Sequence, residues 1–221
     1  MPNLNKLSEL KKLCDKNNAL LVAVSKTKSV EEILSVYNAG QKVFGENKVQ
    51  EITDKYEQLP KDIEWHFIGH LQRNKVKYIA PFVDLIHGVD SLRLAKEINK
   101  QANNNQRKIR VLLQMHIAQE STKFGFDMDE LTEILSAGEL LTLENLEICG
   151  LMGMATFTDD AEQVDQEFSY LYNCFQKIQS RFFSNKENFK EISMGMSGDY
   201  ELALKNGSTM VRVGSAIFGE R

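Results

Sequence analysis

The sequence predicts an α/β fold: a single (β/α)8 barrel of the TIM type with an extra N-terminal helix. Short segments rich in valine, leucine and isoleucine alternate with amphipathic helical segments along the whole chain, a pattern typical of a parallel sheet. We count eight such strand and helix units, the number that closes a barrel. No glycine-rich dinucleotide-binding motif follows the first strand, which argues against the competing architecture, an open doubly wound sheet.

Length and composition set the limits of this prediction. The 221 residues are 42% hydrophobic and 26% charged with a net charge of −4, so we expect one domain over residues 1–221 and neither nucleic-acid nor membrane binding. No apolar segment has the length of a signal peptide or a membrane span. Cys14, Cys149 and Cys174 are odd in number and far apart, which predicts buried thiols in a cytoplasmic protein.

The elements follow in order along the chain. Residues 1–17 form an amphipathic helix packed on the barrel, with Leu4, Leu7, Leu10 and Leu13 on one stripe. The apolar run 19–24 is the first strand, and Ser29 is placed to cap the first helix of the barrel. The remaining segments are assigned by the same periodicities: strands over 42–45, 64–69, 83–87, 109–117, 146–154, 191–196 and 209–213, and helices over 30–38, 46–58, 73–77, 91–105, 127–140, 160–183 and 199–205, with a closing segment from 215.

Lys26 ends the first strand in the stretch Val24-Ser25-Lys26-Thr27-Lys28. Because side chains alternate along a strand, Val22, Val24 and Lys26 point the same way. If they face the inside of the barrel, the Lys26 amine lies at the carboxyl end of the strand, partly removed from water, where it can form a Schiff base with an aldehyde. The alternative is that Lys26 ends the strand and points to solvent.

Working residues of such barrels lie at the carboxyl ends of the strands, and a phosphate is commonly held after strands seven and eight. There, alternation turns Arg212 inward. An ion pair between Arg212 and a barrel carboxylate and a plain helix cap at Ser197 are the alternative explanations of these two residues. The polar residues and glycines at these strand ends are Lys26, Asn47, His70, Asp90, Thr122, Lys123, Ser193, Ser197, Arg212, Gly214 and Ser215.

A Schiff-base lysine facing a phosphate site suggests a ligand with an aldehyde at one end and a phosphate at the other, and pyridoxal 5′-phosphate (PLP) has that shape. The sequence also resembles the PLP homeostasis proteins, which are similar to the N-terminal barrel of alanine racemase. The segments that carry the resemblance are VSKTK at 24–28, FGEN at 44–47, WHFIGHLQRNK at 65–75, LM at 151–152, SMGMS at 193–197 and GSTMVRVGSAIFG at 207–219.

The resemblance implies roles for several residues. Lys26 would carry PLP as an internal aldimine, Asn47 would lie near the ring, and the phosphate would be held by Ser197, Arg212, Gly214 and Ser215, although Arg212 could instead face the ring nitrogen. Met154, Met194 and Met196 would line the pocket, and Lys28 and Lys123 would be secondary contacts or solvated lysines. His116 stands where the family usually has an asparagine.

Metal binding is the less favoured use of the histidines. His66 and His70 are four residues apart, a spacing that suits zinc only on a helix, and here it falls on a strand and its exit loop. The basic run of Arg73, Lys75 and Lys77 is explained most simply as a solvated helix face.

We therefore expect a non-enzymatic cytoplasmic protein that binds PLP, buffers it and delivers it to PLP-dependent apoenzymes, and that is monomeric. The racemase reaction needs a second acid/base group opposite the lysine, which by resemblance comes from a C-terminal domain that we do not expect here. The alternatives are a slow PLP-dependent racemase or decarboxylase and a cofactor-free Schiff-base aldolase.

Overall fold

Eight parallel strands close into a barrel in the part of the chain that the structure, a computed structural model, describes: residues 1–119 and 124–219. Each strand pairs with the next in sequence, and β8 returns to pair with β1, where Val22 lies opposite Arg212. The predicted (β/α)8 barrel with its N-terminal helix is confirmed. The strands are β1 Leu20–Val24, β2 Val43–Glu46, β3 Glu64–Phe67, β4 Leu85–Val89, β5 Ile109–Gln114, β6 Leu146–Met152, β7 Glu191–Ser193 and β8 Met210–Val213.

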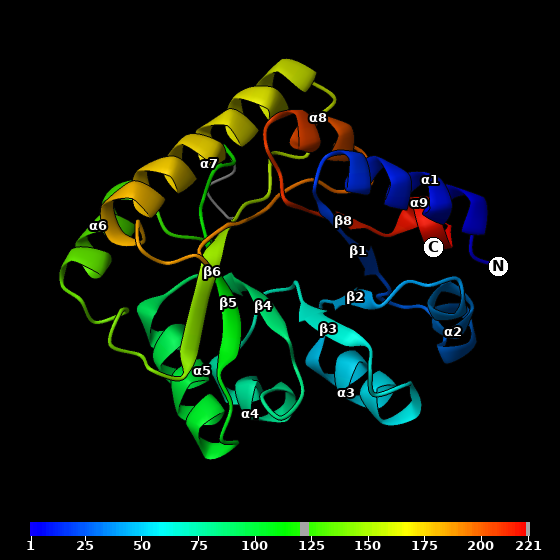
Figure 1. Ribbon diagram of the computed structural model, residues 1–221, viewed down its shortest axis with the longest axis horizontal. Helices are drawn as coiled ribbons and strands as arrows, with labels where there is room; N and C mark the ends of the chain where they lie inside the picture. The colour runs from blue at the N-terminus through cyan, green and yellow to red at the C-terminus, as the bar shows by residue number, and fades with distance from the viewer. Residues whose placement is uncertain (120–123, 220–221) are drawn as a thin grey trace.

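Helices surround the strands on the outside (Figure 1). As predicted, the Ser29 side chain caps the helix after β1, accepting from the Glu32 amide while the Glu32 carboxylate accepts from the Ser29 amide. The helical segments are α1 Leu4–Lys16, α2 Val30–Asn38, α3 Val49–Gln58, the 3-10 turn η1 Arg73–Lys75, α4 Val76–Ile79, α5 Leu92–Asn104, α6 Met128–Ser136, α7 Ala161–Phe182, α8 Tyr200–Lys205 and α9 Ser215–Phe218. Within the described residues, no helix combines the length and the apolar character needed to span a membrane.

The N-terminal helix packs beside the last one, so the two ends of the chain lie close together (Figure 1). The Asn3 amide donates to the Ile217 carbonyl at 2.7 Å. The buried stripe of α1 is Leu7, Leu10 and Cys14, whereas Leu4 is 42% exposed. The predicted leucine stripe was therefore partly wrong, because a strict three-residue spacing drifts around a helix of 3.6 residues per turn.

Strand alternation separates two apolar regions. On β1, Leu21 and Ala23 belong to the large core between sheet and helices, whereas Val22 packs inside the barrel. The barrel interior contains an apolar cluster to which six strands contribute side chains: Val22, Val43, Leu85, Leu112, Cys149, Met152 and Met210. Ser193 and Arg212 bring buried polar side chains to the interior near the carboxyl ends of β7 and β8, and this is where the candidate site begins.

Several boundaries differ from the prediction. Glu46 was expected to begin a helix, but it is the last residue of β2, paired in register with Phe67, and α3 begins only at Val49. The expected basic helix at 73–77 is a 3-10 turn followed by one turn of α-helix. Strands five, six and seven end two or three residues early, because their pairing with neighbours stops while the apolar pattern continues into the loops.

Candidate functional site

A cavity of about 660 Å³ opens at the carboxyl ends of the strands. Its lining comes from the ends of β1, β5 and β8 and from the loops after β2, β3, β6 and β7. The six residues predicted to carry the ligand, lie near its ring or hold its phosphate all line this cavity: Lys26, Asn47, Ser197, Arg212, Gly214 and Ser215. The barrel thus unites residues that are up to 189 positions apart in the sequence, from position 26 to position 215.

Lys26 lies two residues beyond the end of β1 and is partly buried. Val22 is in the barrel interior and Val24 lines the cavity, so the alternation that predicted an inward Lys26 holds along this strand. Its side chain lines the cavity. Thr27, the next residue, has φ +66°, a conformation that β-branched residues rarely adopt.

Arg212 is the charged residue most deeply placed in the cavity wall, with 3% of its surface exposed. Its guanidinium donates to Ser193 Oγ and, at 3.1 Å, to the Gly153 carbonyl. Among the described residues no carboxylate forms an ion pair with it, so the predicted alternative of a barrel salt bridge is not what the structure shows. Burial lowers the pKa of Arg212 to about 10, opposed by the charge of Asp199.

A hydrogen-bond chain continues from Arg212 into the barrel interior. Ser193 Oγ lies 2.9 Å from His87 Nδ1, and His87 Nε2 lies 3.0 Å from His66 Nδ1. Both imidazoles are completely buried; burial lowers the pKa of His66 to about 3 and that of His87 well below its usual value. These four residues, which we call the interior chain, therefore carry a single positive charge at neutral pH, that of Arg212.

Asn47 and Ser197 bring further polar groups to the cavity wall. Asn47 Oδ1 is buried and accepts no hydrogen bond within the described residues. A Cβ at Gly69 would lie 2.5 Å from the Asn47 carbonyl oxygen, so only glycine allows the chain after β3 to pass this close.

Ser197 Oγ accepts from the Gly214 amide at 3.1 Å and so joins the loops after β7 and β8. Burial raises the pKa of the neighbouring Asp199.

The structure places other predicted residues elsewhere. Met194 is fully buried in the core between sheet and helices, because it follows Ser193 and alternation turns it outward; Met154 and Met196 do line the cavity. Lys28 Nζ donates to the Phe218 and Gly219 carbonyls at the end of α9. Thr122 and Lys123 lie outside the described residues.

His66 and His70 contact different partners. His66 faces His87, whereas His70 Nδ1 lies 3.0 Å from Asp90 Oδ2 and its ring stacks on Phe124. The described part of the chain holds no group of three or more His, Cys, Asp or Glu side chains placed to bind a metal ion. His116 is not among the described residues that line the cavity, and its amide donates to the Phe126 carbonyl.

Sequence reasoning missed Gln114 and Thr156, which also line the cavity. Gln114 ends β5 and donates to the Phe124 carbonyl at 2.9 Å. Thr156 follows β6, and the buried Glu167 of α7 accepts from its amide and its hydroxyl. The alternation of β5 was a usable signal for Gln114, whereas the contact between Thr156 and Glu167 has no signature in the sequence.

Residues 4–221 match the family model of the alanine racemase N-terminal domain. The pyridoxal phosphate homeostasis protein of Aquifex aeolicus is 40% identical over 97% of this chain and 95% of its own length, and that of Escherichia coli K12 is 37% identical over 91% of this chain and 85% of its own length.

Solved structures agree with these matches. PipY of Synechococcus elongatus PCC7942 with PLP bound has a TM-score of 0.88 and 33% identity, covering 98% of this chain and 99% of that one. Alanine racemase of Bartonella henselae, at 14% identity, has a TM-score of 0.71, covers 96% of this chain and 58% of that one, and shows the shared fold alone.

Proposed function

The chain belongs to the alanine racemase N-terminal domain family, among the pyridoxal phosphate homeostasis proteins, and on this premise we propose that it binds PLP covalently through Lys26. The observation that carries the proposal is the pairing, in one cavity, of a partly buried lysine with a buried guanidinium that has no carboxylate partner among the described residues. An anion is the ligand that such a cation favours.

The residues present fit PLP. The ligand supplies an aldehyde, whose carbon becomes doubly bonded to Lys26 Nζ while its oxygen leaves as water. Arg212 supplies a positive charge that has no carboxylate partner among the described residues. Ser197 and Ser215 offer a hydroxyl and a backbone amide to a phosphate, beside Gly214, whose own amide donates to Ser197 Oγ. The unused acceptor of Asn47 suits a ring hydroxyl.

We further propose that the protein stores and releases PLP and has no turnover of its own. Stereochemical inversion of an amino acid needs a second acid/base group across from the lysine, and in racemases by resemblance this is a tyrosine. No tyrosine is present among the described residues that line the cavity. A cytoplasmic monomer that supplies PLP-dependent apoenzymes is the form in which this function would operate.

Absorption spectroscopy tests the proposal. We expect purified protein to acquire a visible band on addition of PLP and to lose it on borohydride reduction, with mass spectrometry placing the reduced adduct on Lys26. In Lys26→Ala the band and the adduct should both disappear, whereas Lys28→Gln, a matched neighbouring lysine, should retain them. An adduct distributed over surface lysines would contradict the proposal.

A second assay separates storage from catalysis. Loaded protein should restore activity to a PLP-dependent apoenzyme and should racemise or decarboxylate amino acids no faster than free PLP. Turnover well above free PLP that requires Lys26 would instead make the protein a slow enzyme.

A further inference from the structure

Lys26 is flanked by two residues whose backbones are held from outside the barrel, and this feature is not part of the cavity. Ser25 is completely buried, and each of its polar groups has a partner. Its amide donates to the Gly45 carbonyl at 3.0 Å, its hydroxyl donates to Glu46 Oε1 at 2.7 Å, and its carbonyl accepts from Lys55 Nζ at 2.9 Å. The residue before Lys26 therefore has little freedom to move.

Thr27, on the other side of Lys26, is fixed in the same way. Its amide donates to Glu51 Oε2 at 2.8 Å. Because its φ is +66°, the Thr27 backbone is in a strained region, and such strain persists only where surrounding contacts impose it. The Glu51 carboxylate is the contact that holds this amide in place.

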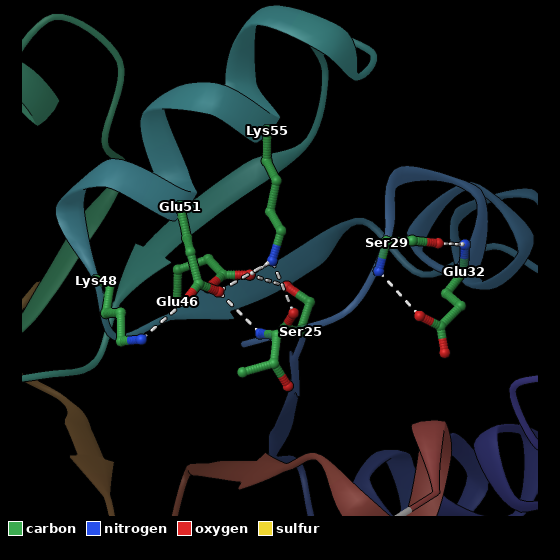
Figure 2. Close-up of polar contacts among 8 residues, drawn as sticks. Ser25, Ser29, Glu32, Glu46, Lys48, Glu51 and Lys55 are labelled. Atoms are coloured by element: carbon green, nitrogen blue, oxygen red, sulfur yellow. Dashed lines mark hydrogen bonds and ion pairs between the residues drawn. The ribbon is translucent and has the colours of Figure 1, made fainter. Parts of the chain in front are cut away.

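Three side chains provide these contacts, and we call them the anchor: Glu46 at the end of β2 and Glu51 and Lys55 one turn apart on α3. Figure 2 shows Lys55 reaching from α3 to Glu46 and Ser25, and Glu51 turned toward the same place. Lys55 Nζ lies 2.6 Å from Glu46 Oε1 and 3.5 Å from Glu51 Oε2, so one ammonium joins both carboxylates.

The anchor buries charged groups, and moving charges out of water costs free energy. Glu46 is completely buried, Lys55 is 7% exposed, and Glu46 Oε2 accepts no hydrogen bond within the described residues. Burial raises the pKa of Glu46, although Lys55 and Ser25 oppose the rise. Apolar residues of similar volume often stabilise a core as well or better, so stability alone does not account for a buried pair of this kind.

We propose that Glu46, Glu51 and Lys55 are positioning residues: they hold the backbone on both sides of Lys26 so that its amine enters the cavity in the orientation needed to react with an aldehyde. This inference rests on the proposed function, because it assigns the anchor to the same lysine. It adds residues that do not line the cavity and that act only through the loop.

The test separates two steps: the covalent reaction of Lys26 with an aldehyde, which we call capture, and noncovalent binding of the ligand in the cavity. PLP reports capture by Lys26, followed as the rate of appearance of the borohydride-trapped adduct. Pyridoxamine 5′-phosphate, which has a phosphate but no aldehyde, reports cavity binding alone through its Kd. In Glu51→Ala we expect capture to slow by about tenfold or more, while the Kd of pyridoxamine 5′-phosphate stays within about twofold of the unaltered protein.

Three further variants define the anchor. Glu51→Gln keeps an oxygen acceptor for the Thr27 amide and should restore most of the capture rate. The double variant Glu46→Gln with Lys55→Met removes the buried charges together, so that neither is left unpaired, and should also slow capture. Ser29→Ala is the matched control, because it loosens the start of α2 in the same loop region without touching Ser25 or Thr27, and it should leave the capture rate unchanged.

Each outcome is decisive. Capture at the unaltered rate in Glu51→Ala and in the double variant would overturn the positioning role. An equal loss in Ser29→Ala would also overturn it, since general loosening of the loop would then be the cause. If the unaltered protein forms no adduct on Lys26, the proposed function itself fails, and this result is distinct from the other two.

Discussion

Two buried polar networks lie on the inner and the outer side of the barrel wall, and they differ in whether their charges are paired within the protein. The interior chain of His66, His87, Ser193 and Arg212 ends in a guanidinium that has no carboxylate partner among the described residues. The anchor on the outer side joins Lys55 to two carboxylates. A network whose charges are satisfied within the protein serves to hold structure, and one that ends in an unpaired charge facing a cavity is prepared for a ligand.

The largest effect on stability is expected from a substitution that breaks the anchor. Lys55→Met leaves Glu46 buried without its cation, so the free energy of unfolding should fall by about 3–5 kcal/mol. Urea denaturation followed by circular dichroism measures it. The exposed pair Lys42–Asp62 offers the control, since Lys42→Met should change stability by less than about 1 kcal/mol. A Lys55→Met protein as stable as the unaltered one would show that the anchor is not an effective ion pair.

For the interior chain we expect a substitution to change the free energy of unfolding in the opposite direction. Arg212→Met removes a buried charge that has no ion-pair partner in the part of the chain that the structure describes, so the ligand-free protein should keep its stability or gain up to about 2 kcal/mol. Binding of PLP should weaken by about 100-fold, because charge-assisted hydrogen bonds are lost. Denaturation and equilibrium titration on the same sample check both. Loss of stability together with unchanged affinity would reverse our comparison of the two networks.

Acid should weaken the interior chain in a defined pH range. His66 has a folded pKa of about 3 against about 6.5 when unfolded, so the unfolded state binds more protons below pH 6.5. The stability that neutral His66 contributes is complete above pH 6.5 and falls as the pH drops toward 3, by up to about 1.4 kcal/mol per pH unit.

Replacement of this histidine isolates the effect. In His66→Phe the slope of stability between pH 6.5 and 5 should be smaller than in the unaltered protein, as measured by denaturation at several pH values. Parallel slopes for the two proteins would exclude the buried imidazole as their cause.

The smallest effect on stability is expected from a substitution outside both networks. Ser29→Ala removes the cap of α2 and should lower the free energy of unfolding by about 1 kcal/mol without changing the affinity for PLP. Denaturation and PLP titration check it. A change in affinity would mean that the loop after Lys28 contributes to the cavity.

Local patterns predicted much of the fold and the candidate site. The eight strands, the Ser29 cap and the inward direction of Lys26 and Arg212 follow from periodicities of two and 3.6 residues and from capping chemistry, which act over a few neighbouring residues. The pocket role of Met194, which the resemblance implied, was wrong: Met194 follows the inward Ser193, so alternation turns it into the core between sheet and helices.

The sequence by itself determined the kind of barrel and which side chains stand at the carboxyl ends of its strands. Only the tertiary structure decided which buried polar groups meet: Glu46 with Lys55, and His66 with His87. The physical reason is that such partners belong to different elements, so their distances depend on barrel closure and strand register rather than on any spacing along the chain.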